Sequence, residues 1–414
     1  MTTLEQMGAR AKEAARQLTL CEGIKDQALT AVAKALRDHT KEILAANAID
    51  LKNGEENGMK QALMDRLRLT EERIEGMAQG VDDIVALKNP IGTILEGSRL
   101  PNGLRIERVR VPLGVIGIIY EARPNVTSDA AALCLKAGNV VILRGGKEAF
   151  HSNQCVTEVM RNALKESGLP EDCVQLVQDT SRASAAEMMA LTEYLDVLIP
   201  RGGAGLINSV VENSRVPVIQ TGAGNCHVYV DAFADIPMAA EIIFNAKTQR
   251  PSVCNAIETI VVHQDIAADA LPVIKERLDE KNVELRGDER AQAILPDINA
   301  ATEEDWATEY GDYILAVRVV DTFEEAIDHI AKYSTGHREC IVTEDYRSAN
   351  RVVEMVDCAA VYVNASTRFT DGGMFGMGAE IGISTQKLHA RGPMGLEQLT
   401  SSKFIVRGDG QVRE

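Results

Sequence analysis

Between residues 114 and 231 the sequence alternates short apolar runs with longer segments of helical periodicity. The apolar runs are residues 115–119, 140–143, 174–177, 197–199 and 217–219. Between these runs lie helical patterns at residues 128–136, 152–167 and 204–211. Strands that are apolar on both faces are typical of a parallel sheet covered by helices on its two sides. This β-α-β alternation predicts a doubly wound parallel sheet of the nucleotide-binding type.

A second α/β unit follows the first along the chain. Its predicted elements are strand 257–262, helix 266–278, strand 314–320, helix 322–333, strand 340–343, helix 345–355 and strand 360–363. A chain of 414 residues is too long for one ordinary core, so two or three folding units are expected. We predict a nucleotide-binding domain over residues 1–230, a catalytic domain over 231–367, and a segment over 368–414 that returns to the first domain and ends in an arm strand.

Two further features belong to the predicted first domain. Residues 4–87 carry apolar residues at helical spacing and predict a helical lead-in. Residues of about 97–112 predict a β-hairpin, because Asn102-Gly103 is a tight-turn pair and the second strand alternates apolar with charged side chains. A two-stranded ribbon is marginally stable alone, so it packs either on its own domain or on a neighbouring subunit. Residues 403–407 form one more predicted strand that can join the hairpin.

Composition and charge exclude several classes of protein. The formal net charge is −17, whereas a general nucleic-acid surface needs a basic footprint. The sequence has neither a signal-like N-terminus nor a long uncharged apolar run, so we expect no export and no membrane segment. The eight cysteines show no C-x-x-C pair and no metal-ligand spacing. This pattern predicts reduced thiols, no metal site and a cytoplasmic protein.

Cys254 is the cysteine whose position suggests chemistry. It lies shortly after Arg250, at a junction between a helix-like segment and the predicted strand 257–262. A helix end and a nearby cation such as Arg250 would favour the thiolate, which is the nucleophilic form of a cysteine. The alternative is that Cys254 is a small hydrophobic residue of the core, as most free cysteines are.

Three stretches carry a resemblance to the aldehyde dehydrogenase superfamily over essentially the full chain. They are residues 120–128 (YEARPNVTS), 250–256 (RPSVCNA) and 379–393 (AEIGISTQKLHARGP). The resemblance implies two doubly wound α/β domains and a small β oligomerisation arm, hence a homo-oligomer. Within the superfamily, the chain is similar to members that use NADPH to reduce L-γ-glutamyl phosphate to L-glutamate 5-semialdehyde and phosphate, in proline biosynthesis.

The resemblance also implies chemical roles. Cys254 would attack the acyl phosphate, expel phosphate and carry the glutamyl group as a thioester until hydride reduces it. Asn125 and the backbone N–H of Cys254 would stabilise the negative oxygen, although Asn125 could instead cap the following helix. Gln220 stands where oxidative members carry a general-base glutamate. This difference favours acyl-phosphate chemistry over hydrolysis.

Arg144 and Lys147 bear on the choice of cofactor. They follow the predicted strand 140–143, where the superfamily often has a lysine and, three residues on, a glutamate that binds the adenosine ribose. Two cations there would instead attract a 2′-phosphate, which favours NADPH over NADH. The alternative is that both are solvated loop cations.

The other implied contacts are glycines and charged residues. Gly202 and Gly203, which open a helix after a strand, could face a pyrophosphate. Glu309 matches a glutamate that binds the nicotinamide ribose, or is a surface charge. The substrate carries a phosphate and an α-carboxylate, which call for cations. The candidates beside the three motifs are Arg123, Arg250 and Arg368.

Two other functions are compatible with the sequence. A hydrolytic NAD(P)-dependent aldehyde dehydrogenase would make a carboxylic acid, and Gln220 disfavours it. A non-catalytic scaffold on the same fold is disfavoured by the presence of Cys254 and Asn125. Because an acyl phosphate of glutamate cyclises onto its own amine, we also expect a handover from a glutamate kinase.

Overall fold

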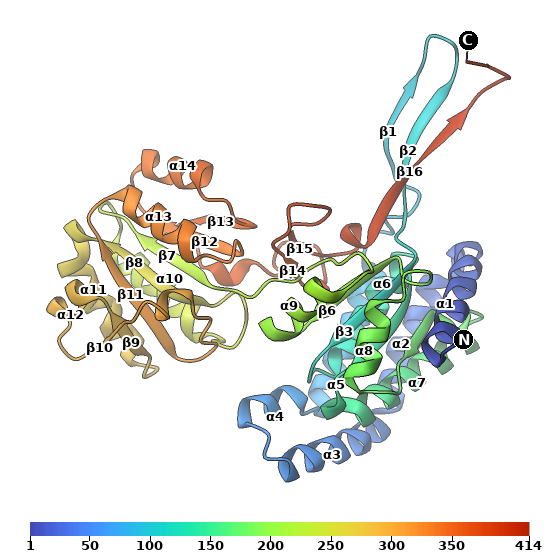
Figure 1. Cartoon of the computed structure of the whole chain (residues 1–414), viewed down its shortest axis with the longest axis horizontal. Coiled ribbons are helices and arrows are strands. Elements are labelled where there is room, and N and C mark those ends of the chain that lie inside the picture. Colours follow the sequence, from blue (N-terminus) through green and yellow to red (C-terminus); the bar gives the residue numbers. More distant parts are fainter. Residues whose placement is uncertain (414) are drawn as a thin grey trace. The chain divides into compact units, whose positions relative to one another are not determined.

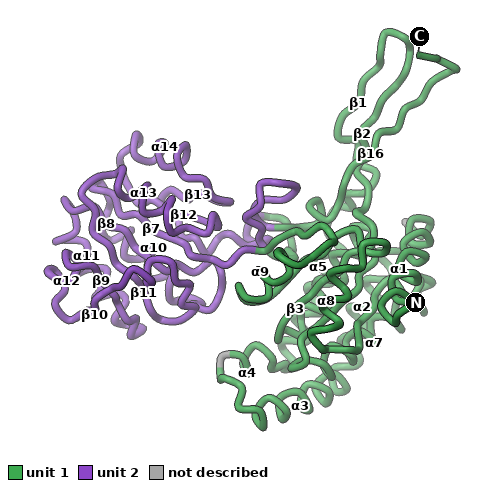
Figure 2. Tube along the Cα trace, in the orientation of Figure 1, with its two compact units in different colours: residues 1–221, 376–382, 394–414 green, residues 222–375, 383–393 purple. Residues whose placement is uncertain are grey.

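The computed structural model describes residues 1–413. The chain forms two compact units, which Figure 2 draws in two colours. Unit 1 consists of residues 1–221, 376–382 and 394 onward, and unit 2 of residues 222–375 and 383–393. The sequence predicts the first change of unit at residue 230, but β7 (Cys226–Val230) pairs within the sheet of unit 2. Much of the predicted return segment after residue 367 also stays with unit 2.

The sheet of unit 1 has four parallel strands in the order β5-β4-β3-β6. Their bounds are β3 (Val115–Tyr120), β4 (Val140–Gly145), β5 (Val174–Leu176) and β6 (Val197–Arg201). Every residue of β3 is buried, as predicted for a strand covered on both faces. The predicted strand 217–219 is reduced to a single bridge between Val218 and Leu198. Pro217 has no N–H to continue the ladder.

Helices surround this sheet (Figure 1). The predicted lead-in consists of α1 (Thr3–Leu20), α2 (Lys25–Asp38), α3 (Thr40–Glu56), α4 (Gln61–Leu67) and α5 (Glu71–Ala86). The later helices of the unit are α6 (Asn125–Lys136), α7 (Phe150–Glu166), α8 (Arg182–Met189) and α9 (Ala204–Asn213). In α2 the residues at helical spacing, from Ala28 through Val32 to Leu36, are fully buried. The helical periodicity of the lead-in therefore identified its core-facing side.

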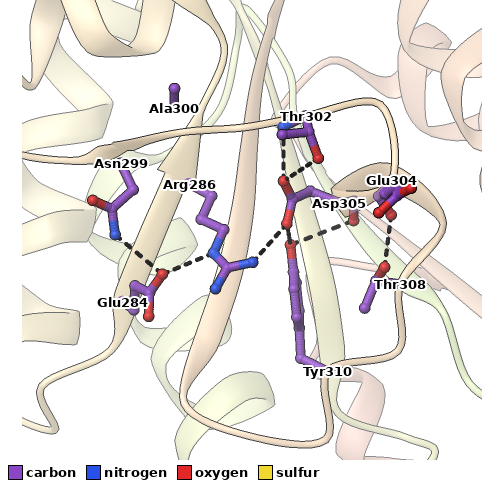
Figure 3. A pocket seen from close by; sticks show the side chains of 9 residues that line it. All are labelled: Glu284, Arg286, Asn299, Ala300, Thr302, Glu304, Asp305, Thr308 and Tyr310. Carbon is purple, nitrogen blue, oxygen red and sulfur yellow. Dashed lines mark hydrogen bonds and ion pairs between the residues drawn. The ribbon is translucent and has the colours of Figure 1, made fainter.

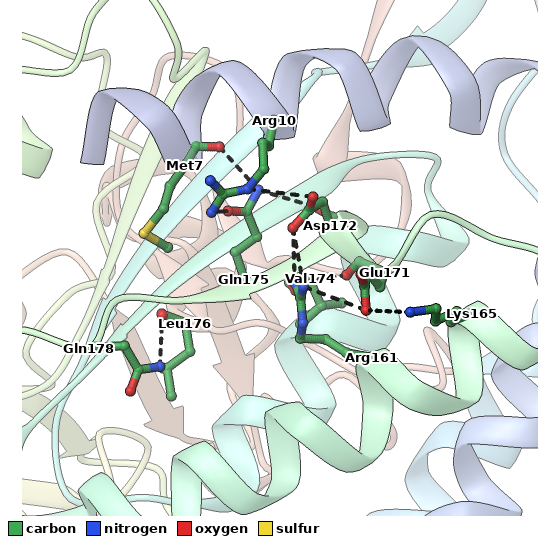
Figure 4. Close-up of polar contacts among 10 residues, drawn as sticks. All are labelled: Met7, Arg10, Arg161, Lys165, Glu171, Asp172, Val174, Gln175, Leu176 and Gln178. Atoms are coloured by element: carbon green, nitrogen blue, oxygen red, sulfur yellow. Dashed lines mark hydrogen bonds and ion pairs between the residues drawn. The ribbon is translucent and has the colours of Figure 1, made fainter. Parts of the chain in front are cut away.

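A polar network fixes the edge strand β5 to the helices beside it (Figure 4). Arg161 of α7 donates to the carboxylate of Asp172 at 3.2 Å and to the carbonyl of Val174 at 2.6 Å. Gln175 of β5 donates to the carbonyl of Met7 in α1 at 3.1 Å. These bonds satisfy polar groups where the sheet ends, so β5 is not an open edge.

The hairpin forms a three-stranded antiparallel arm with the C-terminal strand. The strands are β1 (Ile94–Arg99), β2 (Arg105–Pro112) and β16 (Thr400–Arg407), in the order β1-β2-β16. Gly103 has φ +92°, which the tight turn between β1 and β2 requires and which L side chains rarely adopt. All six residues of β1 are exposed, so this strand does not pack on its own domain.

The sheet of unit 2 has seven parallel strands in the order β10-β9-β11-β8-β7-β12-β13. Besides β7 they are β8 (Ile257–His263), β9 (Glu284–Gly287), β10 (Asn299–Ala300), β11 (Ile314–Val320), β12 (Arg338–Val342) and β13 (Ala360–Val363). Strands β7, β9 and β10 were not predicted from the sequence. The remaining strands and the α/β class are confirmed.

Two layers of helices cover the sheet of unit 2. They are α10 (Ile236–Thr248), α11 (Gln264–Asp279), α12 (Glu289–Ile294), α13 (Phe323–Tyr333) and α14 (Tyr346–Met355). Val228 and Val230 of β7 pack with α10 and α11, whereas Tyr229 packs with α13 and α14. Successive strand residues point to opposite faces, so each strand serves two cores. None of the helices that the structure describes is long and apolar enough to cross a membrane.

A buried ion pair closes the segment between α10 and β8. The Nζ of Lys247 lies 2.6 Å from Oε2 of Glu258 and 3.0 Å from the carbonyl oxygen of Ile257. Both charged side chains are almost fully buried. Burial raises the pKa of Glu258 to about 7, against the opposing effect of the Lys247 ammonium. The pair therefore joins the two ends of the loop that contains Cys254.

We expect Lys247→Met alone to lower the free energy of unfolding by about 3–5 kcal/mol, because it leaves the buried Glu258 carboxylate without a counter-charge. Adding Glu258→Leu removes that carboxylate and recovers most of the loss. Urea unfolding followed by circular dichroism measures both changes. As a control, Lys275→Met removes one partner of the surface pair with Asp279 and changes the free energy by less than about 1 kcal/mol. A double variant no more stable than Lys247→Met would contradict this account.

Candidate active site

Cys254 lies in the loop between the end of α10 and the start of β8, with a free and half-buried thiol. Four other cysteines are fully buried, and burial raises the pKa of those in the cores, among them Cys134, Cys226 and Cys340. Cys254 is therefore not sealed in a core, unlike those four cysteines.

The peptide of Cys254 is held from two sides within unit 2. Its carbonyl oxygen accepts from Nη1 of Arg338 at 2.7 Å and from Sγ of Cys226 at 3.4 Å. A Cβ built on Gly224 would lie 1.8 Å from the same oxygen. Only glycine fits at position 224, because any side chain would displace the loop.

A second segment of unit 2 is tied to the same loop. Asn255 donates to the carbonyl of Thr370 at 3.1 Å, and Thr367 Oγ1 donates to the carbonyl of Asn255 at 2.8 Å. These bonds hold Arg368 beside the thiol loop, where its Nε donates to Gln249 at 3.0 Å. Two residues that the sequence analysis selected, Arg368 and Cys254, are thus in one neighbourhood.

The charges around the thiol interact with one another. Burial lowers the pKa of Arg368, the negative form of Cys254 opposes that effect, and the positive charges of Arg250 and Arg338 add to it. Arg250 is exposed. The structure therefore places Arg250, Arg368 and Arg338 in the same part of unit 2 as Cys254. The third predicted arginine, Arg123, belongs to unit 1.

Glu309 precedes β11 and is exposed. Its Oε1 accepts from the backbone N–H of Gly224 at 3.1 Å, so it is joined to the segment that packs on the thiol loop. Gly224, Cys254, Glu309 and Arg338 all lie at or before the amino ends of parallel strands. Because those ends share one edge of the sheet, the candidate residues of unit 2 gather there.

A hollow of about 450 Å³ lies farther along this sheet and is drawn in Figure 3. Arg286 crosses it, with Nε 2.7 Å from Glu284 and Nη1 2.9 Å from Asp305. Tyr310 also donates to Asp305, at 2.7 Å. Burial alone would raise the pKa of Asp305, but bonds from Tyr310, Thr302 and Arg286 hold it below its usual range. These charged groups are paired with one another, so we assign the hollow a structural role.

In unit 1 the candidate residues lie at the carboxyl ends of the strands. Asn125 follows β3 and begins α6, Arg144 is near the end of β4, and Gly202 and Gly203 follow β6. The order β5-β4-β3-β6 has its topological switch point between β3 and β6, where such sheets bind ligands. The N–H of Gly203 donates to Glu121 Oε2 at 2.9 Å, so this amide already has an acceptor.

Asn125 does not cap α6. The N-cap position is Pro124, and no side-chain capping bond is formed there. The exposed Asn125 side chain instead donates through Nδ2 to Asp129 Oδ2 at 2.9 Å. Burial raises the pKa of Asp129 to about 6, and the bond from Asn125 opposes that shift. A carboxamide nitrogen has two hydrogens, so one bond fixes its direction and leaves the second for another acceptor.

Arg144 and Lys147 differ in accessibility. Arg144 donates through Nη2 to the carbonyl oxygens of Thr180 at 2.6 Å and Ser181 at 2.8 Å, and burial lowers its pKa. Lys147 is exposed, and no ion pair of its side chain is formed among residues 1–413. Lys147 is therefore the more available cation for an anionic ligand.

Sequence reasoning missed Arg338, Gly224 and the Lys247–Glu258 pair. The only signal for Arg338 was a pair of charged residues, Arg338-Glu339, directly before an apolar run. Gly224 gave no signal beyond its glycine-rich surroundings. In the described part of the chain, no group of three or more His, Cys, Asp or Glu side chains could hold a metal ion.

Comparisons with known proteins show the family of this chain. The chain matches the aldehyde dehydrogenase family over residues 2–308 and 306–405. It is 59% identical to γ-glutamyl phosphate reductase of Heliobacterium modesticaldum, over 99% of both chains. It is 57% identical to that of Halothermothrix orenii, over 98% of this chain and 97% of the other. The crystal structure of γ-glutamyl phosphate reductase from Thermotoga maritima matches with TM-score 0.97 and 50% identity over 100% of both chains. The chain therefore belongs to the aldehyde dehydrogenase family of oxidoreductases and, within it, to the γ-glutamyl phosphate reductases.

Proposed function

We propose that this chain reduces L-γ-glutamyl phosphate to L-glutamate 5-semialdehyde and phosphate, with NADPH as hydride donor and Cys254 as covalent nucleophile. The observation that supports it most directly is the thiol loop of unit 2. The thiol of Cys254 is half-buried, and Arg338 holds its loop by a hydrogen bond to the carbonyl oxygen of Cys254. Arg250 and Arg368 lie near this thiol. An anionic acyl donor needs this combination of a nucleophile and neighbouring cations. The names of the relatives point to the same reaction.

The reaction follows from the chemistry of these groups. The thiolate of Cys254 attacks the carbonyl carbon, the bond to the phosphate oxygen breaks, and phosphate leaves with the electron pair, so a thioester forms. When bound, NADPH supplies the hydride that brings this thioester to the aldehyde level. The backbone N–H of Cys254 and the carboxamide of Asn125 are the proposed donors to the negative oxygen. Gln220 has no carboxylate to activate water, so the thioester is not hydrolysed by a base at that position.

The carboxyl edge of the unit 1 sheet fits a dinucleotide. It contains the topological switch point, and α9 begins just after Gly202 and Gly203, so its N-terminus favours a pyrophosphate. The exposed Lys147 and the neighbouring Arg144 suit the 2′-phosphate of NADPH. Glu309 is the proposed partner of the nicotinamide ribose.

The proposed partners follow from the chemistry of the substrate and from the arm. Arg123, Arg250 and Arg368 are proposed to bind the phosphate and the α-carboxylate. The arm leaves Ile94 57% and Phe404 65% exposed, which supports a homo-oligomer formed through β1 or β16. A glutamate kinase that delivers the labile acyl phosphate is a further proposed partner. Free cysteines throughout the described chain suit the reducing cytoplasm.

Oxidation of L-glutamate 5-semialdehyde with NADP⁺ should require added phosphate or arsenate, because only these anions can release the glutamyl group from Cys254. Absorbance at the wavelength of NADPH measures the rate. Cys254→Ser should lower it by about 10³-fold or more, since the nucleophile is lost. Cys155→Ser, at another half-buried thiol, is the matched control and should leave it unchanged. Equal rates without either anion would instead identify a hydrolytic aldehyde dehydrogenase.

Asn125→Ala should lower kcat by roughly 10²–10³-fold with a smaller change in KM, because an oxyanion donor acts in the transition state. Steady-state kinetics with the acyl phosphate or in the reverse direction measures both constants. Asn350→Ala removes an exposed asparagine of α14 and serves as the control. If kcat is unchanged in Asn125→Ala, this residue is not an oxyanion donor.

Lys147→Glu should reduce the preference for NADPH over NADH by roughly 10- to 100-fold, because a hydrogen bond to a charged group contributes about 1.5–3 kcal/mol. The ratio of kcat/KM for the two cofactors is the measurement. Lys41→Glu reverses an exposed charge on α3 and should leave the ratio as it is. An unaltered ratio in Lys147→Glu would place the determinant of cofactor choice elsewhere.

A further inference from the structure

Arg338 carries a buried positive charge and has no role in the proposed reaction. It is the first residue of β12, and its side chain is fully buried. Its Nη1 donates to the carbonyl of Cys254 at 2.7 Å. No carboxylate within residues 1–413 forms an ion pair with it. The Arg338 guanidinium is therefore hydrogen-bonded to the peptide of Cys254, and no carboxylate of the described chain pairs with its positive charge.

The adjacent Glu339 does not neutralise Arg338. Its Oε2 accepts from the backbone N–H of His227 at 2.8 Å and lies 3.0 Å from the Nδ1 of that residue. Its Oε1 accepts from the hydroxyl of Ser334. Neighbouring residues of a strand point to opposite faces of the sheet, so Glu339 faces away from the thiol loop.

One edge of the Arg338 guanidinium is unfilled. Nε and Nη2 are buried and have no hydrogen-bond partner. These two nitrogens form a planar fork that matches the two oxygens of a carboxylate or phosphate. A buried cation without a counter-charge is unfavourable unless an anion comes near it. The same charge lowers the pKa of Arg368, so it acts on the groups around Cys254.

We infer that Arg338 is a positioning residue that also determines specificity, because it fixes the Cys254 peptide and attracts anionic acyl donors to the thiol. The inference depends on the proposed function only in taking Cys254 as the nucleophile. The charge acts through the low dielectric of the interior, where a cation attracts anions more strongly than in water. The fork is covered in this structure, so the attraction does not require that the anion contacts Arg338.

Alkylation of Cys254 by iodoacetate, which is anionic, and iodoacetamide, which is neutral, tests this role on the full-length protein. The rate constants are measured from the mass of the peptide that contains Cys254. We expect the iodoacetate-to-iodoacetamide ratio to fall by about tenfold in Arg338→Gln and in Arg338→Met, which lack the charge. Arg338→Lys keeps the charge and should keep most of the ratio. A change in thiol ionisation or loop geometry affects both reagents alike and cancels in the ratio.

The half-buried Cys155 in unit 1 is an internal control, and its ratio should be the same in all variants. Thermal melting shows whether each variant is folded. If neither neutral variant folds, the double variant Arg250→Gln/Arg368→Gln still tests the idea, because Arg338 is then the remaining one of the three arginines near Cys254 and the ratio at Cys254 should still exceed that at Cys155. Equal ratios at the two cysteines, or an unchanged ratio in folded Arg338→Gln, would overturn the inference. Alkylation needs neither cofactor nor glutamyl phosphate, so its outcome is independent of the reductase assay.

Discussion

The ion pair between Lys247 and Glu258 is the interaction on which the geometry of Cys254, the proposed nucleophile, depends. It joins the end of α10 to the start of β8, and the loop between these elements contains Cys254. Glu258 also accepts from the backbone N–H of Gly311 at 3.3 Å, so the same carboxylate reaches the segment that contains Glu309. Two charges in a core are favourable only when they are paired and hydrogen-bonded. The pair therefore fixes both the loop that contains Cys254 and the segment that contains Glu309.

The two units use opposite ends of their parallel strands. In unit 1, Asn125, Arg144 and the glycines after β6 follow the carboxyl ends, as expected for a doubly wound sheet that binds a nucleotide. In unit 2, Cys254 and Arg338 lie at the amino ends, where the preceding loops return from the helices. Helix N-termini favour anions at the first edge, whereas the second edge obtains its positive charge from arginine side chains.

The sequence predicted most of the fold because apolar periodicity reports burial directly. The apolar runs of unit 1 correspond to β3 to β6, and the sequence alone predicts that Cys254 lies between a helix and a strand, which are α10 and β8. The strand predicted at 217–219 failed since Pro217 cannot donate to a ladder. Strand β7 was missed because residues 226–230 adjoin the predicted end of a domain. Their membership of the second sheet depends on pairing with β8 and β12, which are distant in sequence.

By itself, the sequence determined the α/β class, the position of the thiol, the family resemblance and most of the candidate residues. Each of these rests on local patterns or on short contiguous motifs. Only the tertiary structure decided that Arg338 holds the Cys254 carbonyl, that Gly224 must lack a side chain, and that Asn125 binds Asp129. Arg338 is 84 residues from Cys254 along the chain. A contact over such a distance is fixed by the order of strands in the sheet, which no local pattern contains.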